Sequence, residues 1–244
     1  MAVQYHWDLI QGTDDWLRVR HGMLTASEMK NFITAAKMQV ANHKETRAHI
    51  YQLAYERVTG YLDPYFESWD MQRGKIEEVY AKDLYSKHYE QVRDCGFITN
   101  DKLGFMVGFS PDGLVGENGL IECKSRKGNL QFQTIVDNVA PVDFNVQVQT
   151  GLWVSERDWC DFLSYGNGMP MFKERCYAED KAQNAVTEAA RIAEEKILET
   201  IETYKKVVEE RGLITAPRRD PEDGTEIKPS HRYDRDQADY LIEG

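Results

Sequence analysis

No apolar segment of this sequence approaches the roughly 18 consecutive residues that a membrane-spanning helix needs. The opening "MAVQYHWDLIQ" also lacks the basic region followed by an apolar region that marks a secretory signal. Hydrophobic residues make up 41% and charged residues 29% of the 244 residues, which is the balance of an ordinary globular domain. We therefore expect a cytoplasmic protein without membrane association.

Cysteine is scarce and histidine is scattered. The sequence has four cysteines and six histidines, with no C-x-x-C pair and no histidine spacing typical of a metal site. A disulfide framework or a structural zinc site is therefore not predicted. The pattern indicates reduced thiols, as in a cytosolic protein. The cysteines are Cys95, Cys123, Cys160 and Cys176.

Positive charge is in deficit. The 30 Lys and Arg residues are outnumbered by 41 Asp and Glu residues, which gives a formal net charge of -11. Proteins that bind nucleic acids nonspecifically usually carry a basic footprint, so the overall balance argues against that class. A local basic channel stays possible, because the field at a surface depends on where the charges lie.

The first 89 residues are predicted to be mostly helical. Thr25 and Glu28 have the spacing of a capping box, which predicts a helix that begins there. A second helix is expected to end at Gly60. A third is expected in "WDMQRGKIEEVYAKDLYSKHY", and its apolar face comprises Ile76, Val79, Tyr80 and Leu84.

Short β-type segments begin near residue 90. "EQVRDCGFITN", "LGFMVGFS" and "GLIECKS" are separated by turn residues and predict consecutive strands. Residues 145–155 are ambiguous, because their valines alternate as in a strand while their length suits a helix. A hairpin is predicted around Gly166 to Pro170. Apolar residues every three or four positions then predict a long helix over 180–211.

Two acids and a lysine lie close together in "GFSPDGLVGENGLIECK". If "LIECK" is a strand, Glu122 and Lys124 share one face with Leu120. The segment between the acids suits a hairpin connection that would bring Asp112 beside Glu122. The alternative is a plain hairpin with an internal Glu–Lys pair, and the spacing alone favours neither.

A divalent cation would explain why these charges are tolerated. Two adjacent carboxylates repel each other, and an oxygen-liganded cation cancels that charge. Mg²⁺ takes only one or two carboxylates and keeps several waters, which suits a phosphodiester substrate. Lys124 would then help to orient or deprotonate an attacking water and stabilise developing negative charge.

These residues resemble the core of PD-(D/E)xK nucleases, and the chain more narrowly resembles the phage lambda-type exonucleases, the viral alkaline exonucleases of recombination. The resemblance covers most of residues 10–165. It is carried by four ordered segments, "DDWLRVRHGMLTASE", "MQRGKIEE", "GFSPDGLVGENGLIECK" and "NVQVQTGLWVS".

The resemblance implies a metal site. Asp112 and Glu122 correspond to metal-binding acids, the Cys123 carbonyl to a further ligand, and Lys124 to the catalytic lysine. Glu78 falls where the family has another acid near the metals, and Glu77 is its rival. Two Mg²⁺ ions are implied, with Mn²⁺ as a substitute.

The resemblance also implies a pocket for a DNA 5′-phosphate, formed by Arg20, Ser27, Ser110 and Gln147. Arg20 offers a two-pronged donor for phosphate oxygens. Ser27 is expected in the first turn of a helix, where free amides favour an anion. Without the resemblance, Arg20 would be interpreted as a surface ion-pair residue and Gln147 as a solvent-facing residue of a helix.

The implied fold is α/β (mixed α+β), with a restriction-endonuclease-like central mixed sheet flanked by helices. Residues 1–211 would form one nuclease domain, comprising a helical part (1–89), a sheet core (90–178) and the long helix (180–211). Residues 212–244 are expected to form a charged, mobile tail. The resemblance also implies that residues 145–155, which are ambiguous from their pattern alone, form a helix. The family pattern has a proline after the lysine strand, whereas this chain continues "SRKGNLQF", so the following loop differs.

The implied function is a Mg²⁺-dependent 5′-to-3′ exonuclease on ends of linear double-stranded DNA, acting in phage or bacterial host cytoplasm. It would release mononucleotides and leave a 3′ overhang for a single-strand annealing protein. The resemblance also implies a homotrimeric ring, and basic residues turned inward in such a ring would reconcile DNA binding with the acidic composition. The alternatives are a restriction-like endonuclease, or a non-catalytic DNA-end-binding recombination protein.

Overall fold

A mixed five-stranded sheet carries the acidic segment of the chain. The computed structural model describes residues 3–61 and 68–229. In the order β11-β10-β9-β8-β5, the β9 and β10 strands run parallel and the other neighbours are antiparallel. This confirms the predicted mixed sheet and the hairpin that β10 and β11 form. The strands are β5 (Val92–Arg93), β8 (Gly113–Val115), β9 (Gly119–Ser125), β10 (Trp159–Gly166) and β11 (Met169–Tyr177).

A second sheet brings the N-terminus beside the middle of the chain. Its order is β1-β6-β7-β2, with β2 parallel to β7. Strands that follow one another in sequence, β6 to β9, therefore divide between two sheets. The members are β1 (Gln4–His6), β2 (Leu24–Thr25), β6 (Phe97–Asn100) and β7 (Val107–Phe109), and a separate hairpin pairs β3 (Ile33–Thr34) with β4 (Gln39–Val40).

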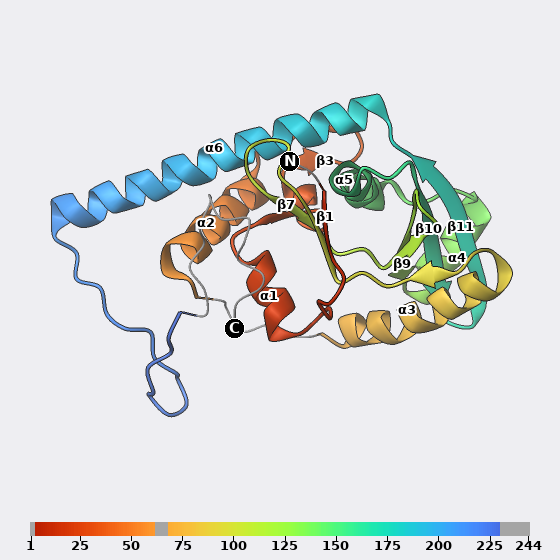
Figure 1. Cartoon of the computed structure of the whole chain (residues 1–244), viewed down its shortest axis with the longest axis horizontal. Helices are drawn as coiled ribbons and strands as arrows, with labels where there is room; N and C mark the ends of the chain where they lie inside the picture. Colours follow the sequence, from red (N-terminus) through yellow and green to blue (C-terminus); the bar gives the residue numbers. More distant parts are fainter. Residues whose placement is uncertain (1–2, 62–67, 230–244) are drawn as a thin grey trace.

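Helices cover both faces of the five-stranded sheet (Figure 1). The α2 helix ends at Gly60, whose φ of 67° is left-handed, as predicted for a glycine stop. Residues 145–155 form a helix, and the long C-terminal helix has the predicted bounds. The helices are α1 (Asp14–Arg20), α2 (Lys44–Thr59), α3 (Trp69–His88), α4 (Gly128–Asp137), α5 (Asn145–Ser155) and α6 (Asp180–Arg211), with short 3-10 helices η1 (Met29–Asn31) and η2 (Val142–Phe144).

The alternation of β9 agrees with the prediction. Leu120 joins the main core, to which α5 and α6 contribute. Ile121 and Cys123 belong to a smaller cluster with Tyr85 of α3. Glu122 and Lys124 therefore point toward the α5 side of the sheet, and α3 packs on the other side.

The predicted helix at the capping box is wrong. Thr25 is the last residue of β2, and only the three residues of η1 become helical after Glu28. The Glu28 carboxylate accepts from the Asn31 side chain and caps no helix at Thr25. Pairing of β2 with β7 holds Thr25 in an extended conformation, so tertiary contacts override the local signal.

The predicted apolar face of α3 is wrong for three of its four residues, and the fourth, Leu84, is half-buried. Ile76, Val79 and Tyr80 are exposed at 61%, 56% and 58%. The helix instead buries Ala81 and Tyr85, and the Tyr85 hydroxyl donates to the buried Asp161 carboxylate at 2.7 Å. This buried polar anchor therefore holds the C-terminal half of α3 on the sheet.

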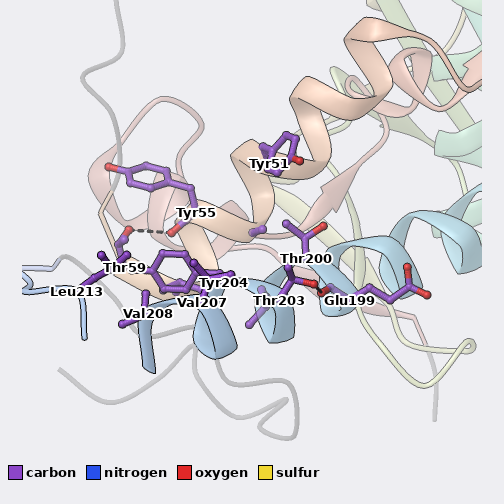
Figure 2. Close-up of a pocket in the computed structure, with 13 residues that line it drawn as sticks. Tyr51, Tyr55, Thr59, Glu199, Thr200, Thr203, Tyr204, Val207, Val208 and Leu213 are labelled. Carbon is purple, nitrogen blue, oxygen red and sulfur yellow. Dashed lines mark hydrogen bonds between the residues drawn. The ribbon is translucent and has the colours of Figure 1, made fainter. Parts of the chain in front are cut away.

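The α2 and α6 helices pack side by side and are joined by a buried ion pair. Arg57 donates two hydrogen bonds to Glu194, at 2.9 and 2.8 Å. Beyond this pair, the two helices line an apolar groove of about 740 Å³. Figure 2 shows Tyr51 of α2 and Tyr204 of α6 beside it, with Leu213 at its end.

The segment after α6 lacks regular helices and strands as far as residue 229. One isolated bridge joins Arg219 to Glu226, and Arg218 donates to the Tyr55 hydroxyl at 2.9 Å. The rest of the predicted tail, 230–244, lies outside the described residues. Within residues 3–61 and 68–229, every helix is too short or too polar to span a bilayer.

Candidate active site

The two predicted acids meet where β8 begins. The antiparallel register pairs Gly113 with Ile121, so Asp112, one residue earlier, lies across from Glu122. The Cys123 amide donates to Asp112 Oδ2 at 2.6 Å. In a strand, the N–H and C=O of one residue point to the same side, so the Cys123 carbonyl also faces the Asp112 side. The sheet thus brings together the two carboxylates and the carbonyl.

Glu122 is almost completely buried, with 1% of its surface exposed. Its Oε1 accepts from Gln147 Nε2 at 2.6 Å and lies 2.6 Å from Lys124 Nζ. Its Oε2 is buried and accepts no hydrogen bond from the described residues. A buried carboxylate oxygen without a donor is costly, so this atom is suited to a cation.

Lys124 and Gln147 complete a ring of contacts around Glu122. Lys124 Nζ donates to Gln147 Oε1 at 3.1 Å and lies 5.5 Å from the centre of the Phe144 ring. The amide of Gln147 therefore bridges the acid and the lysine. Gln147 therefore lies beside the acids, although the sequence predicts that it binds a phosphate.

Glu77 and Glu78 point in different directions. Glu77 accepts from the Ser125 hydroxyl and from the Asn167 amide, the latter at 3.3 Å. Glu78 contacts Lys82 at 3.2 Å and is close enough to Asp112 for the charge of Asp112 to affect its pKa. Because Ser125 and Asn167 engage Glu77, Glu78 stays the predicted further acid of the metal site.

Burial and mutual repulsion raise the pKa values of the acids. Desolvation, followed by the charge of Asp112, raises the pKa of Glu122 to about 8. The same two causes raise the pKa of Glu78 to about 7, and burial also raises the pKa of Asp112. Burial opposes the charge of Lys124, but Glu122 and Asp112 outweigh it and raise the pKa of the ammonium group.

The residues present fit a magnesium ion. Within the described ranges, no three acidic, histidine or cysteine side chains already form a metal cluster. Mg²⁺ needs fewer protein ligands, because it retains waters and takes one or two carboxylates. Asp112, Glu122 and the Cys123 carbonyl supply such a set, and a cation would relieve the repulsion that raises the acid pKa values.

Arg20 and Ser110 lie together, with a tryptophan that the sequence did not single out. Arg20 donates to Ser110 Oγ at 2.8 Å, and Trp16 Nε1 donates to the same oxygen at 3.1 Å. The guanidinium of Arg20 also lies 4.2 Å from the centre of the Trp16 ring. Since both lone pairs of the Ser110 hydroxyl are used, its hydrogen is left to donate. The i,i+4 spacing of Trp16 and Arg20 on α1 was the available signal.

Ser27 follows β2, in a turn rather than in the first turn of an α-helix, so the dipole argument for it is wrong. The amide of Ala26 donates to the Gly108 carbonyl at 2.9 Å, which brings this turn to the same end of the sheet as Ser110. Among the described contacts, Ser27 interacts with Thr25 at 3.4 Å and has none with Arg20 or Ser110. Its assignment to a phosphate pocket stays a prediction.

Comparisons with known proteins place the chain in a family and show similar folds. Residues 15–158 match the model of a family described as the YqaJ-like viral recombinase domain. The chain is similar to crystal structures of LHK-Exo, an alkaline exonuclease from Laribacter hongkongensis, with a TM-score of 0.72. Sequence identity is 25% for one structure and 27% for the complex with dAMP, and each match covers 82% of this chain and all of the other.

A phage-related exonuclease from Haemophilus somnus 129PT matches more distantly. The TM-score is 0.56 at 12% identity, over 76% of this chain and 98% of the other, so this likeness concerns the fold alone. No curated protein matches the chain.

Proposed function

We propose that this chain, which belongs to the YqaJ-like viral recombinase domain family and is a DNA exonuclease, depends on Mg²⁺. In this proposal it degrades one strand of linear duplex DNA from the 5′ end. The observation that carries the proposal is the acidic centre. Asp112, directly before β8, lies across from Glu122 of β9, which contacts Lys124. The buried Oε2 of Glu122 has no hydrogen-bond donor among the described residues.

Each residue of this centre has a chemical role in the proposal. Asp112, Glu122 and the Cys123 carbonyl would hold the cation, and Glu78 would hold a second. When bound, divalent ions lower the pKa of water and neutralise charge on a phosphate. Lys124 orients the attacking water and stabilises the negative charge that develops on the scissile phosphate. Gln147 keeps Lys124 and Glu122 in a fixed relative orientation.

Arg20 and Ser110 would recognise the 5′-phosphate of the DNA end, together with Ser27. Arg20 offers charged N–H donors, and Ser110 has a hydroxyl hydrogen to donate. Ser110 is two residues before Asp112, so a phosphate held there would lie near the bond to be cut. Gln147, at the acids, would contact the same terminal nucleotide.

The products would be mononucleotides and a 3′ single-stranded overhang. LHK-Exo has been crystallised with dAMP, a nucleoside monophosphate, which supports the product class. The overhang is the substrate for a single-strand annealing protein, so we propose such a protein as a partner in recombination. We also propose a ring-shaped homotrimer that encloses the DNA, because a ring could face its basic residues inward despite the acidic composition.

One experiment tests the function. Linear duplexes with a 5′-phosphate or a 5′-hydroxyl, and a closed circular duplex, are incubated with protein and Mg²⁺, and the products are identified. We expect mononucleotides from the linear duplexes, faster with the 5′-phosphate, and no cutting of the circle. Cleavage of the circle would indicate an endonuclease, and binding of ends without cleavage would indicate a non-catalytic end-binding protein.

The matched control is Lys124→Ala. It keeps Asp112 and Glu122 but removes the ammonium group, so it should bind DNA ends while its cleavage rate falls by a factor of about 100 or more. Near-normal cleavage by this variant would contradict the role of Lys124.

A further inference from the structure

We propose that Glu77 is a positioning residue that holds Glu78 against the acidic centre. The inference rests on the proposed nuclease function and adds a residue to it. The sequence left Glu77 and Glu78 as rivals for one role, whereas the structure gives them different contacts. Glu77 accepts from Ser125, the residue after Lys124, and from Asn167, whereas Glu78 contacts Lys82 of its own helix.

Glu77 joins three segments that are distant in sequence. One carboxylate oxygen accepts from Ser125, the last residue of β9, and the other accepts from the amide of Asn167 in the turn between β10 and β11. Ser125 also accepts from Arg73 Nε at 3.0 Å, one helical turn before Glu77. The contact therefore ties α3 to the residue that directly follows Lys124.

The β10–β11 turn is shaped to admit this carboxylate. Gly166 has a φ of 136°, and a Cβ there would lie 2.5 Å from Glu77 Oε2, closer than a Cβ can pack. The strand register also shifts between Ser164 and Gly166. A side chain at this position would displace the carboxylate, so the glycine and the contact belong together.

Anchoring Glu77 sets the direction of Glu78. Consecutive helix residues point about 100° apart, so fixing one side chain fixes the rotation of the next. The α3 helix is held two turns later by the hydrogen bond between Tyr85 and Asp161. That second anchor keeps α3 folded on the sheet, so loss of Glu77 should shift Glu78 without unfolding the protein.

The test uses the full-length protein. Glu77→Ala should lower the rate at saturating DNA about tenfold with Mg²⁺, because small misplacements of reacting groups are costly, while KM for DNA ends stays near the parent value. Glu77→Gln keeps an acceptor for Ser125 and should recover most of that loss. Asp83→Ala, which removes an exposed acid from the same helix, should change neither parameter.

The decisive comparison is made in a Glu78→Gln background. If Glu77 acts through Glu78, Glu77→Ala should cause no further loss of rate there. The same tenfold loss in both backgrounds, or no loss in either, would overturn the proposal.

A second readout does not need catalysis. Binding of Mn²⁺ by the protein, measured by electron paramagnetic resonance, should weaken in Glu77→Ala by the same factor as in Glu78→Gln. Unchanged Mn²⁺ binding in Glu77→Ala, with weakened binding in Glu78→Gln, would reject the positioning role. A parent protein that binds Mn²⁺ but does not cut DNA would contradict the proposed function instead.

Discussion

Burial of the Glu122 carboxylate has an energetic cost that its neighbours offset only in part. Gln147 and Lys124 both contact Oε1 of Glu122, whereas Oε2 has no hydrogen-bond donor among the described residues. The raised pKa of Glu122, about 8, expresses the same imbalance, because the neutral acid is favoured where a negative charge is poorly solvated. Metal binding at this residue should therefore release a proton over a wide range of pH.

This coupling gives a prediction about pH. Between the ordinary value of 4.5 and about 8, folded Glu122 holds a proton that the unfolded chain has lost. Without metal, the free energy of unfolding should therefore fall as pH rises through this window. Mg²⁺ binds the ionised acid, so it should raise the melting temperature more at about pH 9 than at about pH 6.

Calorimetric melting curves with and without Mg²⁺ at the two pH values measure this difference. Glu122→Gln is the control, because an amide does not ionise, and the dependence on pH should shrink in that variant. Equal stabilisation of the parent by Mg²⁺ at both pH values would contradict the coupling.

At the scale of elements, the buried contact between α2 and α6 connects the N-terminal part of the chain to the long helix. The side chains of Arg57 and Glu194 are 3% and 4% exposed. Their mutual attraction offsets the loss of hydration only while both are present. Loss of either partner would therefore leave an unpaired charge buried between α2 and α6.

Arg57→Ala should lower the free energy of unfolding by about 3–5 kcal/mol, because it leaves the Glu194 charge buried and unpaired. Urea denaturation measures this change. The control is Lys205→Ala, which removes an exposed partner of Glu202 and should cost less than about 1 kcal/mol. A similar, small effect of both substitutions would show that the buried pair is unimportant for stability.

Elements with strong local periodicity were predicted well from the sequence. The apolar spacing of residues 180–211 gave both bounds of α6, and the glycine after Thr59 gave the correct end of α2. The strands before residue 41 have two or three residues each, which is too few to show alternation. The pairing of β1 and β2 with distant strands therefore escaped prediction, and a helix was expected instead at Thr25.

The candidate site divides in the same way. Asp112, Glu122 and Lys124 were brought together by strand alternation and one hairpin, both visible in sequence. Trp16 contacts Ser110, and Glu77 contacts Ser125, across long sequence separations that no local pattern encodes. The buried face of α3 was missed for a related reason, because a tyrosine hydroxyl that donates to the buried Asp161 holds the C-terminal half of the helix on the sheet.

At the scale of the whole molecule, the acidic composition has to be reconciled with DNA as substrate. A formal net charge of -11 repels a phosphate backbone at long range. The proposed ring would confine attraction to its interior. The exposed Ile76, Val79 and Tyr80 of α3 also provide apolar surface of the kind that subunit interfaces bury.

The ring gives a prediction about mass. Light scattering coupled to size-exclusion chromatography, without DNA, should report three times the mass of one chain. The value should hold on dilution, because rings with closed symmetry bury every copy of the interface. A mass equal to one chain, with full exonuclease activity, would contradict the trimer.

Because side chains alternate along β9, the residues that face the acidic centre depend on whether the turn before β9 has an odd or an even number of residues. Adding one residue to the turn of residues 116–118 would exchange odd positions for even ones relative to β8, and Ile121 and Cys123 would take the places of Glu122 and Lys124. The catalytic face would become apolar, and the charges of Glu122 and Lys124 would be buried beneath α3. Insertions or deletions in this turn should therefore be tolerated only in pairs.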